Sequence, residues 1–249
     1  NSQKRRESQF MSNKKMINTR RTIKLFCFLF GLLVYLTGFF PTMVYAFSAD
    51  MYCNFEDLKE HESPDHYNIY TRSADSNILI LASHGGGIEG GTSELARELS
   101  KKYSVFLFEG LKNDCNENLH VTSENFDEPA AVKMAAKHDN VISLHGYADA
   151  RQHILIGGTD EKRAVKLAEL FNKRGFSAEA ISRNHRFGGH EADNIANRNK
   201  SGKSIQIEIS LALRESMFDH FTVDGREHSK NKTFYQFTES LSDFIAENY

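Results

Sequence analysis

The chain has 249 residues, of which 40% are hydrophobic and 26% are charged, with 16 Gly, 3 Pro and no Trp. This composition excludes a disordered polymer, a collagen-like fibre and a coiled-coil rod, and the length suits one ordinary domain or two small ones. The formal net charge of -2 argues against bulk binding of nucleic acid.

The charge is distributed unevenly along the chain. Residues 1–46 hold eight Lys or Arg and one acidic residue, Glu7. The remaining residues therefore hold 23 basic and 32 acidic side chains, a net charge of -9. The near-neutral total conceals a distinctly acidic main part.

The N-terminal segment has the pattern of an export signal. A basic stretch precedes the apolar run 25–40, which Pro41 ends, and small residues follow at positions 44 and 46. This order is typical of a secretory signal peptide. We predict that residues 1–46 are removed, so that the protein is secreted as one domain, 47–249, and meets the membrane only during export. An uncleaved N-terminal membrane anchor is the alternative, although the apolar run is shorter than the ~20 residues of a membrane span.

Export changes the interpretation of the cysteines. Cys27 lies in the predicted signal, which leaves Cys53 and Cys115 in the secreted part. An oxidising compartment permits a disulfide between them. Spacing alone does not show that two cysteines are close in space. A bridge and two free thiols therefore both stay open.

From residue 50 onward, predicted strands alternate with predicted helices. Short apolar or alternating runs predict strands at 77–82, 104–108, 141–144, 153–156, 176–181 and 204–210. Helical spacing and end signals predict helices at 93–102, 128–137, 160–174 and 234–247. The alternation predicts an α/β fold: a single-domain, three-layer αβα arrangement with a mixed, mostly parallel sheet. Such sheets bind ligands at the carboxyl ends of their strands.

Two histidines and a glutamate occupy such strand ends. His84 follows a predicted strand and opens the sequence HGGGIEGG, which contains Glu89, and His145 follows another strand in SLHGY. Imidazole and carboxylate are the ligand types of a catalytic zinc, which keeps one position for water. The glycines allow the loop to curl so that both side chains reach one ion. A phosphate cradle is the alternative, but the lysine and glycine spacing of the known phosphate loops is missing.

Glu208 lies in the alternating strand SIQIEIS. The isoleucines share one face of this strand, and Glu208 lies on the other. An acid in so apolar a strand is unfavourable unless it is paired or near an ion. Hydrolases that use a metal need a carboxylate that is not a ligand to take a proton from water. A solvated face with no function for Glu208 stays open at this point.

Five segments carry a resemblance to a known family. They are SHGGGIEGGTSELA, LHVTSENFDEP, SLHGYAD, NIANR and QIEISLALR, at 83–96, 119–129, 143–149, 194–198 and 206–214. Together they resemble the poly-γ-glutamate hydrolase family of phage-type zinc enzymes. The resemblance implies a zinc-carboxypeptidase-like fold, one zinc held by His84, Glu89 and His145, and Glu208 as general base. The predicted signal departs from the phage members and suggests a secreted bacterial homologue.

The implied substrate, poly-γ-glutamate, is a polyanion, so an acidic protein needs local positive charge to bind it. Arg198 and Arg214 are the candidates, because they lie in the family-like segments near Glu208 and offer a fork that matches a carboxylate. Asn194 is a third candidate, in the segment that contains Arg198. Arg183 and Arg186 lie in a looser basic stretch.

Three further histidines have no firm assignment from the sequence. His185 and His190 could form a second metal site, but we favour a flexible loop that faces the substrate. His120 lies in the LHVTS segment and could line the cleft, with no role that its surroundings in the sequence assign.

The resemblance implies a zinc-dependent hydrolase that cleaves the γ-glutamyl amide bonds of poly-γ-glutamate with a zinc-activated water. From the signal and the charge we expect this hydrolase to be secreted and to have no nucleic-acid partner, and we expect a monomer. One alternative is a zinc amidase or carboxypeptidase acting on cell-wall (peptidoglycan) peptides, which also contain γ-glutamyl links. The other is a non-catalytic protein that binds an anionic polymer. The presence of all four proposed zinc-site residues argues against this last alternative.

Overall fold

The computed structural model describes residues 50–249, which belong to one compact unit. The predicted signal peptide, its cleavage site and Cys27 lie outside the described residues. Cys53 and Cys115 are exposed, free thiols, so the structure contains no bridge between them. Within residues 50–249, no helix has both the length and the apolar character needed to cross a membrane.

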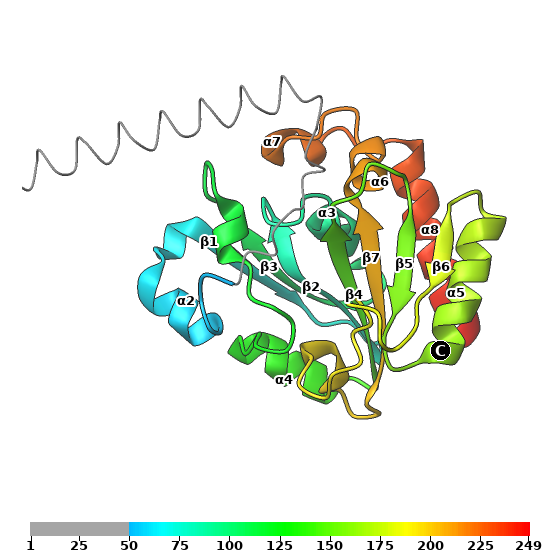
Figure 1. Ribbon diagram of the computed structural model, residues 1–249, viewed down its shortest axis with the longest axis horizontal. Helices are drawn as coiled ribbons and strands as arrows, with labels where there is room; N and C mark the ends of the chain where they lie inside the picture. Colours follow the sequence, from blue (N-terminus) through cyan, green and yellow to red (C-terminus); the bar gives the residue numbers. More distant parts are fainter. Residues whose placement is uncertain (1–49) are drawn as a thin grey trace, which may run out of the picture. The chain divides into compact units, whose positions relative to one another are not determined.

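Seven strands form one sheet in the order β1-β3-β2-β4-β7-β5-β6 (Figure 1). In chain order their bounds are Tyr67–Arg72, Ile78–Gly86, Ser104–Gly110, Asn140–Tyr147, Ile154–Gly157, Ala178–Ala180 and Lys203–Ser210. β3, β2, β4 and β7 run parallel to one another, whereas β1 is antiparallel to β3 and β5 is antiparallel to β7. The prediction of a mixed, mostly parallel sheet is confirmed.

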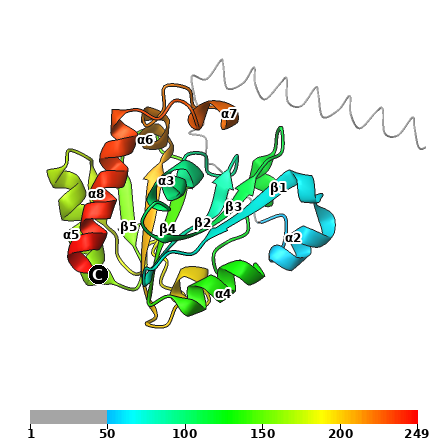
Figure 2. The same ribbon diagram turned by 180° about the vertical axis from the view of Figure 1, so that it is seen from behind.

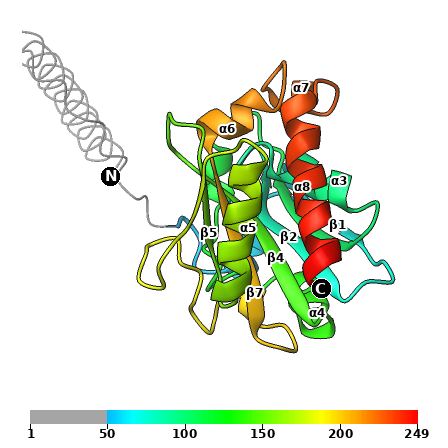
Figure 3. The same ribbon diagram turned by 90° about the vertical axis from the view of Figure 1, so that its right-hand side faces the viewer.

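Helices cover both faces of this sheet. The main helices are α2 (Phe55–His61), α3 (Thr92–Leu99), α4 (Pro129–Lys137), α5 (Glu161–Lys173), α6 (Leu211–Ser216), α7 (Val223–Arg226) and α8 (Lys232–Asn248). α3, α5 and α8 pack on one face, and α2 and α4 pack on the other (Figures 2 and 3). Three short 3-10 helices complete the described part: η1 (Pro64–His66), η2 (Asn116–Leu119) and η3 (Ile195–Asn197). The three-layer αβα prediction is confirmed.

Each face of the sheet has its own apolar core. The alternation along β7 assigns Ile205, Ile207 and Ile209 to the core beneath α3, α5 and α8. Glu208 must therefore point to the opposite face, because successive strand side chains alternate. That second core is made by residues of β2 and β3, of α2 and α4, and of the loop before α4. The site described below lies on this second face.

Two features of the sheet differ from the sequence prediction. β1 and the helices α2, α6 and α7 were not predicted, and β1 is a partly exposed edge strand without a clear apolar alternation. The predicted strand at 153–156 is present as β5 but runs antiparallel to β7. Only the short link 148–153 separates β4 from β5, which leaves no room for the crossover that parallel strands need. The chain therefore reverses direction on the far side of β7.

Candidate metal centre

A β-bulge turns His84 onto the face that carries the site. His84 lies inside β2, not after it as predicted, because β2 extends to Gly86. The pairing of β2 with β3 shifts between Ala82 and Gly85, so β2 has one more residue than β3 over this stretch. Such an insertion reverses the in-and-out alternation. Ala82 packs in the α3-side core, whereas His84 contacts His145 on the other face.

The chain after His84 curls back on itself, and Glu89 is the fifth residue after His84. The Glu89 N–H donates to the His84 carbonyl at 2.8 Å, which closes the curl. Gly86 has φ +64, and a Cβ there would lie 2.4 Å from the Gly110 carbonyl oxygen. Only glycine combines that backbone conformation with so close an approach. The expectation that glycines allow the curl is confirmed at this position.

Arg226 of α7 supports the same loop from behind. Its Nη2 donates to the Gly86 carbonyl at 2.7 Å, and its Nε donates to the Glu94 carboxylate at 2.8 Å. Both charged side chains are buried. The ion pair therefore links α7 to the start of α3 and to the curled loop. Sequence reasoning missed Arg226, because nothing near it in the chain resembles a site.

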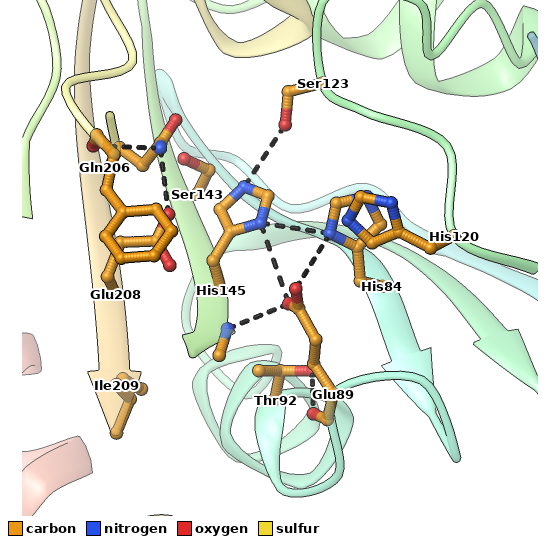
Figure 4. Close-up of polar contacts among 12 residues, drawn as sticks. His84, Glu89, Thr92, His120, Ser123, Ser143, His145, Gln206, Glu208 and Ile209 are labelled. Atoms are coloured by element: carbon orange, nitrogen blue, oxygen red, sulfur yellow. Dashed lines mark hydrogen bonds and ion pairs between the residues drawn. The ribbon is translucent and has the colours of Figure 1, made fainter. Parts of the chain in front are cut away.

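Potential ligand atoms of three residues converge in front of this loop (Figure 4). His84 Nδ1 lies 3.1 Å from His145 Nδ1 and 3.2 Å from Glu89 Oε1, and His145 Nδ1 lies 3.7 Å from Glu89 Oε2. Bonds of about 2.0–2.2 Å to a tetrahedral zinc place neighbouring ligand atoms roughly 3.4 Å apart. The spacing and the donor types therefore fit a zinc ion at the carboxyl ends of β2 and β4.

Hydrogen bonds on the outer sides orient these ligands. His84 Nε2 donates to the Val121 carbonyl at 2.8 Å, so the lone pair of the neutral ring is on Nδ1. Burial lowers the pKa of His84, which favours this neutral form. The Gly146 N–H donates to Glu89 Oε2 at 2.8 Å. Burial raises the pKa of Glu89, but His84 and His145 outweigh it and hold that pKa well below its usual value.

His120 is a third imidazole beside this set. One ligand atom of His120 lies within 4.8 Å of the corresponding atoms of His84 and Glu89. Its ring lies against the His84 ring, with centroids 4.0 Å apart (Figure 4). The set that contains His145 has the shorter distances, 3.1–3.7 Å, so we regard it as the better ligand set. His120 nevertheless lies within the centre, a position that the sequence around it did not indicate.

Glu208 lies next to His145 but outside the ligand set. The two residues are register partners on the parallel strands β4 and β7, so their side chains share a face. Glu208 is only 4% exposed, which excludes the solvated face that the sequence left open. Gln206 Nε2 donates to Glu208 Oε1 at 2.9 Å. Burial raises the pKa of Glu208 to about 7, against the opposing effect of His145.

This raised pKa predicts that Glu208 destabilises the metal-free protein. The unfolded carboxyl titrates near its ordinary pKa, so between that value and about 7 the folded state binds a proton that the unfolded state has lost. Stability must therefore fall as pH rises through this window, by on the order of 3 kcal/mol at pH 8. We expect Glu208→Gln to unfold at a higher temperature than the parent at pH 8 in chelator, with a gap that closes toward pH 5. Equal melting curves at pH 8 would contradict this expectation.

The three predicted substrate residues have partners within the protein. Arg198 is half-buried and donates to the carbonyls of Asp193 and Glu124. Arg214 is 5% exposed and donates to the carbonyls of Ile209 and Gly90. Gly146, next to His145, leaves the space that the Arg214 guanidinium fills: a Cβ there would lie 2.5 Å from Arg214 Cζ.

Asn194 is also fully engaged. Its Nδ2 donates to Gln206 Oε1 at 3.1 Å, and its Oδ1 accepts the Ala196 N–H. Asn194 therefore supports Gln206, which in turn donates to Glu208. The structure brings Asn194 close to the proposed base through this chain of contacts rather than through an open face.

The basic stretch 182–190 forms a loop beside the same strands. The Phe187 carbonyl accepts from Gln206 Nε2 at 3.2 Å, and the Phe187 ring packs on Tyr147 at 5.4 Å between centroids. Arg183 and Arg186 are exposed on this loop. His190 is buried, and its Nε2 lies 3.5 Å from Glu161 rather than beside His185. Among the described residues, no set of three possible metal ligands includes His185 or His190.

The site combines two imidazoles and a nearby carboxylate with a second, buried carboxylate at the carboxyl ends of parallel strands. This combination is typical of metal-dependent hydrolases. Residues 52–240 match the poly-gamma-glutamate hydrolase family. The chain belongs to this family and is therefore a hydrolase.

Relatives and solved structures agree with this assignment. The SPbeta prophage-derived protein YoqZ of Bacillus subtilis (strain 168) is 54% identical over 84% of this chain and 76% of its own length. A structure described as zinc-free YndL is 50% identical, covers 81% of this chain and 100% of that chain, and superposes with a TM-score of 0.80. A bacteriophage poly-gamma-glutamate hydrolase is 36% identical, covers 81% of this chain and 99% of that chain, and has a TM-score of 0.76.

Proposed function

We propose that this protein is a zinc-dependent hydrolase that cleaves the γ-glutamyl amide bonds of poly-γ-glutamate. One observation carries the proposal: His84, Glu89 and His145 present three ligand atoms at zinc-like spacing beside the buried, non-ligand Glu208. Membership of the family and the description of a 50% identical structure as zinc-free support the choice of metal and substrate.

The residues have separable tasks in the proposed mechanism. Bound zinc would supply a Lewis acid that polarises the amide carbonyl and makes water more acidic. Glu208 removes the proton from the attacking water and later delivers it to the leaving amine. Burial raises the pKa of Glu208 in the metal-free protein, which favours a carboxyl that can both accept and return a proton. Gln206 orients the Glu208 carboxylate through its amide.

The decisive assay measures polymer length. Purified protein is incubated with poly-γ-glutamate, with and without a chelator, and with zinc restored. Shortening that the chelator abolishes and zinc restores supports the proposal. Cleavage of peptidoglycan peptides in place of the polymer would favour the cell-wall amidase or carboxypeptidase. Polymer binding without any shortening would favour the non-catalytic binding protein.

We propose Arg198 and Arg214 as the source of positive charge near the substrate, with Asn194 acting indirectly through Gln206. The Arg214 side chain is more buried than that of Arg198, and its charge interacts with Glu89 and Glu208. Arg198 is the more accessible, because it is half-buried at the rim formed by the loops that contain Glu124 and Asp193.

Arg198→Ala is expected to raise KM with little change in kcat. A lost bond between a guanidinium and a carboxylate costs about 1.5–3 kcal/mol, or roughly 10–150-fold. The effect should shrink as salt is added, because salt screens the attraction. Steady-state kinetics across salt concentrations measure it. Arg174→Ala is the matched control, because Arg174 pairs with Asp243 on the α5–α8 side of the sheet. If the kinetics of Arg198→Ala were unchanged, Arg183 and Arg186 would become the next candidates for binding the substrate carboxylates.

Location and assembly follow from the sequence and are proposed with the function. We propose that the protein is exported by its N-terminal segment, acts outside the cell as a monomer, and contacts the membrane only during export. Mass spectrometry of protein from the culture medium tests the first point: a first residue near 47 supports cleavage, and retention in the membrane fraction favours the anchor. Light scattering tests the monomer.

A further inference from the structure

One carboxylate fastens both ends of a three-residue segment beside the candidate metal centre. Asp50 Oδ1 accepts a hydrogen bond from His120 Nδ1 at 2.6 Å, and Asp50 Oδ2 accepts the Thr122 N–H at 2.6 Å. Burial raises the pKa of Asp50, but these two bonds and the nearby imidazoles outweigh it and lower that pKa. Asp50 is therefore ionised, and it grips the segment 120–122 with both oxygens.

The middle of that segment holds His84. The Val121 carbonyl accepts the Nε2–H of His84 at 2.8 Å, and both groups are buried. The His120 ring covers the His84 ring, with centroids 4.0 Å apart and an angle of 34° between the planes (Figure 4). His84 is thus held at one edge by a carbonyl and over one face by a second imidazole. Both contacts come from the segment that Asp50 fastens.

The contacts of this segment decide which nitrogen of His84 faces the ligand set. A neutral imidazole has one N–H and one lone pair, and the hydrogen bond made by the first nitrogen sets the position of the second. Because Val121 takes the Nε2–H, the lone pair is on Nδ1, which lies 3.2 Å from Glu89 Oε1. If the segment moved, His84 could adopt the other tautomer or rotate away from Glu89.

We propose that Asp50 is a positioning residue of the metal centre, which acts through the segment 120–122 to hold His84 with Nδ1 toward the ion. The inference rests on the zinc centre proposed above. The segment lies between η2 and α4 and belongs to no strand, so besides the core packing of Val121 the two bonds to Asp50 help to fix its ends. Asp50 also fixes the proton of His120 on Nδ1, which leaves His120 Nε2 as the atom available to the site.

The test measures the zinc affinity of the full chain without any substrate. Asp50→Asn is nearly isosteric, but its amide NH2 cannot accept the second hydrogen bond. Loss of an outer partner of this kind weakens metal binding by about 10–100-fold, and competition with a chromophoric chelator measures the change. Asp149→Asn is the matched control, because Asp149 also accepts one backbone N–H together with two side-chain bonds, all from Arg151, and within the described part of the chain its side chain forms no hydrogen bond or ion pair with His84, Glu89 or His145.

Cobalt substitution separates positioning from simple stabilisation. If Asp50 positions His84, the absorption bands of bound Co²⁺ should shift in Asp50→Asn, while the melting temperature in chelator changes little. A lower melting temperature in chelator, with zinc affinity within about threefold of the parent and an unchanged cobalt spectrum, would overturn the proposal.

A second variant keeps the test decisive if Asp50→Asn folds poorly. His120→Phe retains a ring against His84 but removes both the bond to Asp50 and the Nε2 atom that is available to the site, so a loss of zinc affinity is expected. Unchanged affinity in this variant would also overturn the proposal. The outcome is distinct from failure of the proposed function: a parent protein that binds zinc but leaves the polymer intact rejects the substrate and does not affect the role of Asp50.

Discussion

Glu208→Gln is expected to lower kcat by about 10²–10⁴-fold while zinc binding stays intact. The glutamine side chain has nearly the same size, so the contact with Gln206 and the packing of β7 can persist. It cannot take a proton from water, however, and the adjacent His145 belongs to the proposed ligand set. Single-turnover kinetics on poly-γ-glutamate, together with zinc content, would measure both effects.

The controls for this variant come from the same strand. Gln206→Glu changes the neighbour that donates to Glu208 and should shift the pH dependence of hydrolysis to higher pH, because a second carboxylate raises the pKa of Glu208 further. Its kcat at high pH should recover toward that of the parent. If Glu208→Gln turned over at nearly the parental rate, another group would have to be the base, and the buried carboxylate would need a different explanation.

His84→Ala is expected to abolish tight zinc binding and, with it, hydrolysis. Three ligand atoms at 3.1–3.7 Å spacing form a minimal catalytic site, and two cannot hold the ion in the same geometry. The loss should exceed the about 10–100-fold that an outer partner contributes. Metal analysis after dialysis and chelator competition would measure it.

His138→Ala provides the comparison for this experiment. His138 lies at the end of α4, where its Nδ1 contacts the Met134 carbonyl, and it has no contact with the ligand set. That variant should retain one zinc per chain. If His84→Ala bound zinc as tightly as His138→Ala, the ion would have to bind elsewhere. This result would also exclude the set of His84, Glu89 and His120, because that set contains His84.

Much of the fold could be predicted because buried strands and amphipathic helices leave local patterns. Residues 77–82 form an apolar run and residues 204–210 alternate between apolar and polar, because β2 and β7 are central strands with an apolar core on at least one face. Asp160 and Glu128 were predicted inside helices but are their N-caps, with side chains that accept the N–H groups of Arg163 and Ala131. Helix ends differ by one or two residues between a sequence prediction and the structure, as these two caps do.

The candidate site was accessible from the sequence only where its residues follow strand patterns. His145 and Glu208 could be placed because both belong to regular strands, and their register in β4 and β7 brings them side by side. Arg226 and Asp50 could not be found in this way. Arg226 reaches the curled loop from α7, and Asp50 reaches His120 across 70 positions of the chain, so no local pattern connects them to the site.

The sequence by itself determined most of the order of strands and helices, the apolar face of the central strands and the residue types of a metal site, because these depend on local periodicity and side-chain chemistry. The tertiary structure decided the rest. It placed His84 on the site face through a bulge relative to β3, and it buried Glu208, whose pKa depends on what surrounds it. It also gave Arg198 and Arg214 backbone carbonyls as partners. These outcomes depend on which distant segments meet, and a linear pattern of residues contains no measure of that proximity.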